Sequence, residues 1–281
     1  MARARRSPAR RENHRAHESQ RDATHDSDTH AGILEFTAVP SPRDALPPLV
    51  TALRETFGDD LRCVLFKGSA KRGDHIPYFS DHDVHAMIDG VGDTHAPDWV
   101  RALAFQRAIG PVDAEAYEVG AIQVEFTPGD RYPADWPVPY PDTYEVIDGT
   151  APFGAPSAEA HLGQAREQLA NVERERDDLV RQVVDRSDRT LVRPVRLLGT
   201  FLSGRLRSAA TVLTGDPERV YTSARAPLVH VVGEAVGNER EMLVFYALAQ
   251  DWREVRQQPE QLRAMFATGI AAFEMFADWR P

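Results

Sequence analysis

Two kinds of hydrophobic periodicity divide this sequence, and together they limit its fold. Over residues 46–127, stretches with apolar residues at helical spacing alternate with short stretches in which every second residue is apolar. Beyond Ser157 nearly every stretch has helical spacing, and the segment between them contains seven prolines. With 281 residues, the chain can form two ordinary domains. We therefore expect an α+β fold in which an all-α helical bundle follows a small mixed β-sheet core with flanking helices.

The first half of the sequence predicts three strands and three helices. A helix should begin at Leu46-Pro47-Pro48, where proline is tolerated, and end near Gly58. The apolar run 62–67 reads as a buried strand, and Gly68-Ser69 after it can open a turn and a short helix. Strict alternation predicts further strands over residues 81–89 and 121–126, with a helix over 97–109 between them.

The second half predicts helices separated by glycine and proline breaks. Residues 158–186 are expected to form one long bundle helix, with Arg176 breaking its apolar register. Further helices are expected over 193–213, 226–236, 238–256 and 259–279. The predicted organisation is a disordered basic tail (1–39), a catalytic domain (40–127), a Pro- and aromatic-rich connection (128–156) and a helical substrate-binding domain (157–281).

Charge, hydropathy and cysteine content narrow the possible partners. The net charge is −10, although the first 21 residues carry seven arginines against Glu12 and Glu18. The acidic body makes nucleic acid an improbable partner, because phosphate neutralisation needs clustered Lys and Arg. No apolar run is long enough to cross a bilayer. Cys63 is the sole cysteine, which suits a reducing cytoplasm. A homodimer is compatible with the sequence.

Two aspartates on one face of a predicted strand are the first candidate site. Asp81 and Asp83 are separated by one residue, so both side chains point away from the apolar Val84 and Ala86. Their carboxylates should therefore lie roughly 6 to 7 Å apart along the backbone. Mg²⁺ commonly takes one or two carboxylates together with substrate phosphates. Asp81 and Asp83 are accordingly the predicted metal ligands, and His85 on the same face is more readily explained as a hydrogen-bonded wall residue.

Other residues near this pair fit the handling of phosphates. Gly68 allows close approach of the backbone, and Ser69 offers a hydroxyl and an N–H at a helix start. Lys71 and Arg72 can offset polyphosphate charge, although both are equally explained as surface charges. Glu125, on the strand 121–126, is a third carboxylate that can accept a proton. Arg193, Arg196, Arg205 and Arg207 form either a solvated basic face or a site for an acidic acceptor.

The run GSAKRGDHIPYFSDHD resembles the nucleotidyltransferases of the DNA polymerase β-like superfamily. Small members show Gly-Ser, a spacer of about ten residues, Asp-x-Asp and a later strand carboxylate. Here these are Gly68-Ser69, Asp81-His82-Asp83 and Glu125. Gly68-Ser69, Arg72, Pro77-Tyr78 and Ser80-Asp81 look most like the aminoglycoside nucleotidyltransferases, including the kanamycin type. The resemblance covers residues 46–127 by motif and extends to the helical part only as architecture.

The resemblance implies an enzyme with a nucleotidyltransferase core. It would use Mg²⁺ and a nucleoside triphosphate, ATP, and move a nucleoside monophosphate to a hydroxyl of a small-molecule acceptor with release of pyrophosphate. Gly68 and Ser69 would contact the triphosphate, Asp81 and Asp83 would bind metal, and Glu125 would be the third carboxylate. Because the base varies within the family, a glutamate of the helical part could replace Glu125; the candidates are Glu234, Glu239 and Glu241.

Two other functions stay open from the sequence. One is transfer of the nucleotide to a protein hydroxyl, as in the minimal nucleotidyltransferases of toxin-antitoxin modules. The other is a noncatalytic nucleotide-binding or interaction module that uses its helical part for binding. The acceptor, the preferred triphosphate and the oligomeric state are not specified by these motifs, because side chains from several helices would have to converge to form the acceptor pocket.

Overall fold

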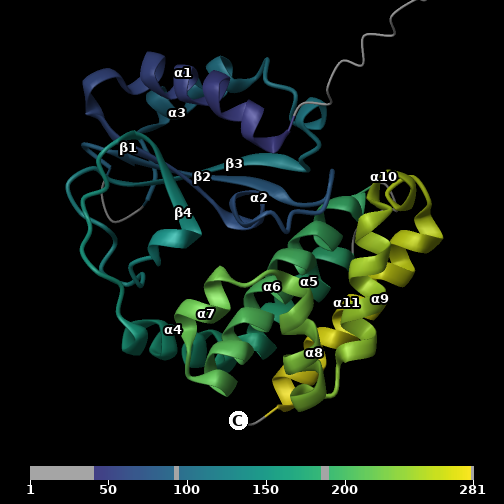
Figure 1. Cartoon of the computed structure of the whole chain (residues 1–281). Helices are drawn as coiled ribbons and strands as arrows, with labels where there is room; N and C mark the ends of the chain where they lie inside the picture. The colour runs from purple at the N-terminus through teal and green to yellow at the C-terminus, as the bar shows by residue number, and fades with distance from the viewer. Residues whose placement is uncertain (1–40, 92–94, 185–189, 280–281) are drawn as a thin grey trace, which may run out of the picture. The chain divides into compact units, whose positions relative to one another are not determined.

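The computed structural model describes residues 41–91, 95–184 and 190–279, all within the compact unit Val39–Pro281. These residues form a mixed α/β structure with one four-stranded sheet and, over the described ranges, eleven α-helices (Figure 1). The mixed fold class expected from the sequence is confirmed at this level. The predicted basic tail over residues 1–39 lies outside the described residues.

The sheet consists of β1 (Leu61–Lys67), β2 (Asp81–Ile88), β3 (Ala121–Pro128) and β4 (Tyr144–Gly149). Its order is β3-β2-β1-β4; β1 is antiparallel to β2 and to β4, whereas β2 and β3 are parallel. The strand β4 lies within residues 128–156, where the sequence predicts an ordered connection but identifies no strand. Its side chains are only half-buried or exposed, so this edge strand lacks the clear apolar alternation that marks β2.

Two helices cover one face of the sheet. The helices α1 (Leu46–Phe57) and α3 (Trp99–Ile109) lie side by side over it in Figure 1. Their apolar residues join those of the strands in one buried cluster, which accounts for the alternation of Val84, Ala86 and Ile88. The short α2 (Gly68–Arg72) directly follows β1, as predicted. The 3₁₀ helices η1 (Pro42–Ala45), η2 (Gly58–Asp60), η3 (Ala114–Tyr117) and η4 (Pro141–Thr143) lie within the described ranges.

The second half is helical, as expected, but its boundaries differ from the prediction. The long helix expected over 158–186 is two helices, because Asn171 interrupts the helix and donates a side-chain hydrogen bond to the carbonyl oxygen of Glu167 (3.1 Å). The span 238–256 likewise divides at Asp251. The helices are α4 (Ala158–Ala170), α5 (Val172–Val184), α6 (Val192–Thr214), α7 (Pro217–Thr222), α8 (Arg225–Val236), α9 (Glu239–Gln250), α10 (Trp252–Val255) and α11 (Pro259–Asp278). The short α7 was not predicted.

The segment between α2 and β2 is anchored in the helical core. Ile76 and Phe79 belong to the same buried cluster as the apolar residues of α6, α9 and α11. The ring of Phe79 packs edge-on against Trp252, with 5.0 Å between centroids. This contact fixes the backbone immediately before Asp81 against the helices. No helix in the described ranges has the length and hydropathy needed to span a membrane.

Candidate functional site

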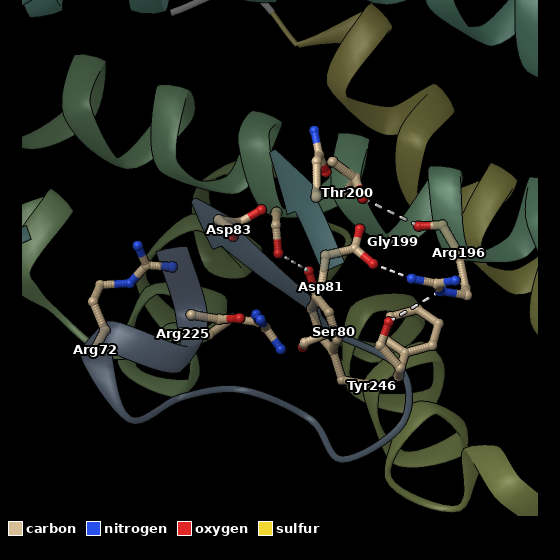
Figure 2. Close-up of a pocket in the computed structure, with 13 residues that line it drawn as sticks. Arg72, Ser80, Asp81, Asp83, Arg196, Gly199, Thr200, Arg225 and Tyr246 are labelled. Carbon is tan, nitrogen blue, oxygen red and sulfur yellow. Dashed lines mark hydrogen bonds and ion pairs between the residues drawn. The ribbon is translucent and has the colours of Figure 1, made fainter. Parts of the chain in front are cut away.

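A small polar cavity lies where β2 begins, and Figure 2 shows its labelled side chains. Its volume is about 120 Å³. The sheet part contributes side chains from α2, β2, β3 and the segment before β2, and the helical part contributes from α6, α8 and α9. The lining residues are Ser69, Arg72, Phe79, Ser80, Asp81, Asp83, Gln123, Arg196, Gly199, Thr200, Ser203, Arg225 and Tyr246.

Close packing joins the Gly-Ser motif to the Asp-x-Asp motif. Lys67 and Asp83 are paired across β1 and β2, so the turn after Lys67 passes over the Asp83 side chain. Gly68 has φ +79, and a Cβ atom at this position would overlap the carboxylate of Asp83, with 2.7 Å to its Cγ. Only glycine allows both this backbone conformation and this approach. The two motifs are therefore parts of one constellation, as the sequence predicts.

Burial makes the carboxyl group of Asp83 a much weaker acid than an exposed aspartate. It raises the pKa of this carboxyl group, and the net effect is a pKa of about 7. Lys67 and Arg72 favour the ionised form, whereas the neighbouring carboxylates of Asp81 and Glu125 oppose it. A bound cation would favour the ionised form of Asp83, because it would offset the repulsion between this carboxylate and those of Asp81 and Glu125.

Asp81, the other predicted metal ligand, has a cationic partner already. Arg196 on α6 forms an ion pair with the Asp81 carboxylate, and its Nε donates a hydrogen bond to the carbonyl oxygen of Phe79 (3.3 Å). One of the dashed lines in Figure 2 joins Arg196 to Asp81 and marks this pair. Burial raises the pKa of Asp81, while Arg196 acts in the opposite direction. A metal ion bound by Asp81 must therefore compete with Arg196.

The donor set is compatible with Mg²⁺ when phosphate oxygens complete it. Asp81 and Asp83 both line the polar cavity, and both belong to the kind of oxygen ligand that Mg²⁺ prefers. Over the described ranges, no group of three His, Cys, Asp or Glu side chains is placed to hold a metal ion. The protein would thus supply a pair of carboxylates, and the remaining ligands would be water and substrate oxygens.

Glu125 lies farther along the sheet than Asp83. In the parallel register of β2 and β3, Gln123 is opposite Asp83, and Glu125 is opposite His85. The Glu125 carboxylate forms an ion pair with Lys67 of β1. It does not line the cavity of Figure 2 but lines a second cavity, described below. The alternative bases Glu234, Glu239 and Glu241 line neither cavity.

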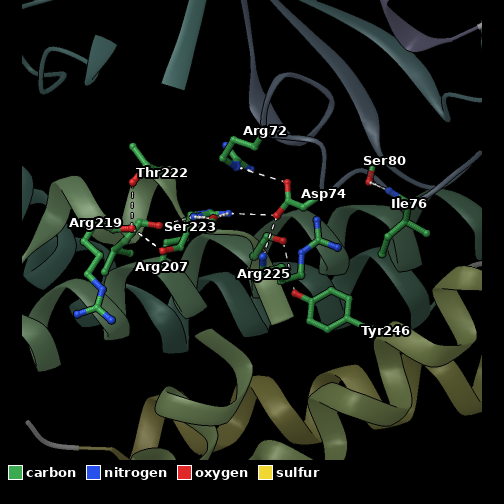
Figure 3. A network of polar contacts seen from close by, with 12 residues as sticks. Arg72, Asp74, Ile76, Ser80, Arg207, Arg219, Thr222, Ser223, Arg225 and Tyr246 are labelled. Carbon is green, nitrogen blue, oxygen red and sulfur yellow. Dashed lines mark hydrogen bonds and ion pairs between the residues drawn. The ribbon is translucent and has the colours of Figure 1, made fainter. Parts of the chain in front are cut away.

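A cluster of arginines surrounds Asp74, next to the polar cavity (Figure 3). Arg72 Nε lies 3.4 Å from Asp74 Oδ1, and Arg207 Nη2 lies 3.3 Å from Asp74 Oδ2. The backbone N–H of Arg225 donates to the same Oδ2 atom at 3.0 Å. Burial lowers the pKa of Arg72, and it lowers the pKa of Arg207 to about 10. Two guanidinium groups therefore share the Asp74 carboxylate, which Arg225 contacts through its backbone.

Two of these arginines face the cavity. Arg72 and Arg225 both line it, and the guanidinium of Arg225 lies 4.8 Å from the ring centroid of Tyr246. Arg196 also lines the cavity, where it pairs with Asp81. A ligand that carries anionic oxygens and a bound divalent cation would complement both the arginines and the two aspartates.

A second cavity, of about 390 Å³, is also lined by Asp83. It shares Arg72, Asp83, Gln123 and Thr200 with the first cavity and adds Gly68, Lys67 and Glu125. Much of the remaining wall is aromatic or proline, with Tyr132, Trp136, Pro137, Pro139 and Tyr140 from the segment 132–140, His161 from α4 and Tyr221 from α7. Thr143 of η4 and Gln164 of α4 complete the lining.

The structure separates the other predicted site residues. Ser69 is buried and lines the first cavity, and Arg72 lines both cavities. Lys71 instead donates a hydrogen bond to the carbonyl oxygen of Asp142 (3.3 Å) and lines neither cavity. His85 is fully buried and its Nε2 lies 2.6 Å from Thr127 Oγ1, the hydrogen-bonded role expected for it. Burial lowers the pKa of His85 to about 3.

Several site residues had no recognisable signal in the sequence. Gln123 alternates with Glu125 on β3, but an exposed glutamine on a strand is unremarkable. Arg225 and Tyr246 lie far from the motif in the chain, and only the packing of α8 and α9 brings them to the cavity. Arg196, Arg205 and Arg207 belong to the predicted basic stretch, and the structure pairs them with three different acidic residues, Asp81, Glu175 and Asp74.

Comparisons with protein-family models, with curated proteins and with solved structures gave no match to this chain.

Proposed function

We propose that the protein is a Mg²⁺-dependent nucleotidyltransferase that moves a nucleoside monophosphate, AMP from ATP, to a hydroxyl group of a small-molecule acceptor. The main support is the close approach of Gly68 to Asp83, because the turn that would bind phosphate then lies directly against the carboxylate that would bind metal. Arg72 and Arg225, which line the same cavity as Asp81 and Asp83, add to this support. Phosphoryl-group transfers depend mainly on such positioning and charge neutralisation.

In this proposal the first cavity binds the phosphates and the metal ion. The β- and γ-phosphates would bind beside Ser69, Arg72 and Arg225 in the first cavity. Asp81 and Asp83 would hold Mg²⁺, which supplies neutralisation of the phosphate charge. Arg196 would release Asp81 and turn to the phosphates, because it lines the same cavity.

The chemical step balances without any oxidant or reductant. The acceptor oxygen forms a bond to the α-phosphorus, and the bond from that phosphorus to the oxygen bridging the α- and β-phosphates breaks. Pyrophosphate leaves with the electron pair of that bond. Glu125 would take the proton of the acceptor hydroxyl, since it lines the cavity adjoining Asp83. Its ion pair with Lys67 would hold the carboxylate in place before the transfer.

The test is a screen with ATP labelled at the α-phosphorus, Mg²⁺ and a set of hydroxylated small molecules. We expect label on an acceptor and an equal amount of pyrophosphate. The Asp83→Asn variant should lose at least about a hundredfold in rate, the scale at which a transition-state contact is lost. Asp89→Asn is the matched control, because Asp89 follows the same strand but pairs with Arg62 and lines neither cavity.

Three results would contradict the proposal. The first is equal pyrophosphate release by the wild type and a folded Asp83→Asn variant. The second is Mg²⁺-dependent ATP binding without turnover for any acceptor, which would support a noncatalytic nucleotide-binding module. The third is label found only on protein, which would support the protein-modifying function instead.

A further inference from the structure

We infer that the second cavity takes an uncharged, hydroxylated aromatic compound as the acceptor, in preference to a polycationic amino sugar. This inference rests on the proposed function for the role of the compound as acceptor. The preference for an uncharged aromatic ring rests on the walls of the cavity alone. It deepens the proposed function, because neither the Gly-Ser motif nor the Asp-x-Asp motif says anything about the acceptor.

The position of Glu125 identifies the acceptor side. Glu125 lines the second cavity and not the first, whereas Ser69 and Arg225 line the first and not the second. Asp83 and Gln123 line both cavities, so the reacting phosphorus would lie where the two cavities adjoin. A hydroxyl that gives its proton to Glu125 must enter from the second cavity. The volume of about 390 Å³ is that of a site for a small organic molecule.

Aromatic rings held by their neighbours form two of its walls. On one wall, Tyr132 and Trp136 pack edge to face with 6.1 Å between centroids, and His95 stacks on Trp136 at 5.1 Å. On the other, the buried His161 stacks on Tyr140 at 4.7 Å and lies 5.0 Å from Tyr221. Because these rings support one another, the cavity is preformed, and such walls favour a flat ring.

The charges of the cavity balance. Glu125 is neutralised by Lys67, and Asp83 lies near Arg72 and Lys67. No other charged residue lines this cavity in the described part of the chain. His161 is buried, which lowers its pKa and keeps the ring neutral. An amino sugar with several ammonium groups would need unpaired carboxylates, since burying an unpaired charge is costly. Gln164 and Thr143 offer neutral hydrogen-bonding groups to hydroxyls instead.

The test measures binding by calorimetry with the full chain, Mg²⁺ and a nonhydrolysable ATP analogue. The two probes are 4-methylumbelliferyl glucoside, which is uncharged and aromatic, and kanamycin, which is polycationic. We expect the glucoside to bind at least about tenfold more tightly than kanamycin. Trp136→Ala should weaken glucoside binding by about tenfold or more. Trp99→Ala is the matched control, because Trp99 is 74% exposed and lines neither cavity.

A second variant keeps the test decisive if Trp136→Ala fails to fold. Gln164→Phe adds bulk from the half-buried face of α4 and should block the glucoside even if Trp136→Ala does not fold. The inference is overturned if kanamycin binds more tightly than the glucoside, if neither probe binds, or if a folded variant of each kind binds the glucoside as the wild type does. If the glucoside binds as expected but no labelled acceptor is ever found, the proposed reaction fails while the ligand preference stands.

Discussion

At the residue scale, the site depends on how close a glycine comes to a carboxylate. Gly68 adopts a left-handed backbone conformation directly over Asp83, and the buried carboxyl group has a raised pKa. Either feature alone is common in proteins. Their combination beside Asp83, which lines both cavities, connects the turn proposed to bind phosphate with the proposed metal ligand.

The Gly68→Ala variant tests the close approach. A positive φ costs alanine about 1 kcal/mol at either Gly68 or Gly73, which has φ +76 and open space around it. At Gly68 the added methyl group also displaces the Asp83 carboxylate. We therefore expect Gly68→Ala to lower the free energy of unfolding by about 1 to 2 kcal/mol more than Gly73→Ala, measured by urea denaturation.

Activity should separate the same pair more strongly. Pyrophosphate release should fall at least about a hundredfold in Gly68→Ala and less than about threefold in Gly73→Ala. Equal effects of the two substitutions on stability and on release would show that the overlap with Asp83 is without consequence.

The acidity of Asp83 predicts how stability changes with pH when metal is removed by EDTA. The pKa of about 7 in the folded state exceeds the ordinary value of 3.8, so the folded state binds more protons between these limits. The contribution of this group is therefore fully present below pH 4 and is lost as the pH rises through 7. Lys67, Arg72, Asp81 and Glu125 are the charged groups that act on it.

The Asp83→Asn variant removes that titration. Relative to the wild type it should gain on the order of 3 kcal/mol in free energy of unfolding between pH 4 and pH 8, since one pKa unit is worth about 1.4 kcal/mol. Denaturation curves at several pH values provide the measurement. A difference between the two proteins that stays constant over this range would contradict the raised pKa.

At the element scale, α6 brings the helical part to the site. Its residues Val195, Leu198 and Leu202 are buried in the helical core, while Arg196 and Thr200 line the polar cavity. This division follows the helical period, which the sequence shows over 193–213. Which basic residue of the stretch contacts Asp81 depends on the placement of α6 against β2, and the sequence period does not determine it.

Arg196 should compete with Mg²⁺ for Asp81. In Arg196→Gln, the Asp81 carboxylate loses its cationic partner, and the affinity for Mg²⁺ without nucleotide should rise about fivefold, corresponding to about 1 kcal/mol for a partly exposed ion pair. Arg193→Gln is the control, because Arg193 is exposed on the same helix and lines neither cavity. Calorimetric titration of Mg²⁺ at low salt measures both. If the affinity of Arg196→Gln for Mg²⁺ is unchanged or weaker, Arg196 does not compete with Mg²⁺ for Asp81.

At the scale of the whole described unit, the segment after α2 belongs to two environments. Its chain neighbours are β1 and β2, but Ile76 and Phe79 lie in the helical core, and Asp74 binds Arg207 of α6 and the backbone of Arg225 on α8. These contacts hold the start of β2 against the helical part of the described unit. The two cavities therefore depend on the packing of the helices as much as on the sheet.

The sequence by itself determined most of the local elements, and it predicted the chemistry proposed for the motif. Period-two alternation identified β2 and β3, helical spacing identified α1, α3 and α6, and the spacing from Gly68 to Asp83 predicted that both serve one site. These features are readable because each depends on residues near in the chain. The edge strand β4 was not predicted because its residues show no clear apolar period. The break at Asn171 was not predicted because it does not interrupt the apolar period of the stretch around it.

Only the tertiary structure decided which distant side chains meet the motif. Arg196, Arg225 and Tyr246 reach the first cavity from three helices, and Tyr221 joins residues of the segment 132–140 around the second. It also decided that Lys71 turns away and that Lys67 neutralises Glu125. The physical reason is that helix placement depends on the fit of buried side chains over the whole core, which no short stretch of sequence contains.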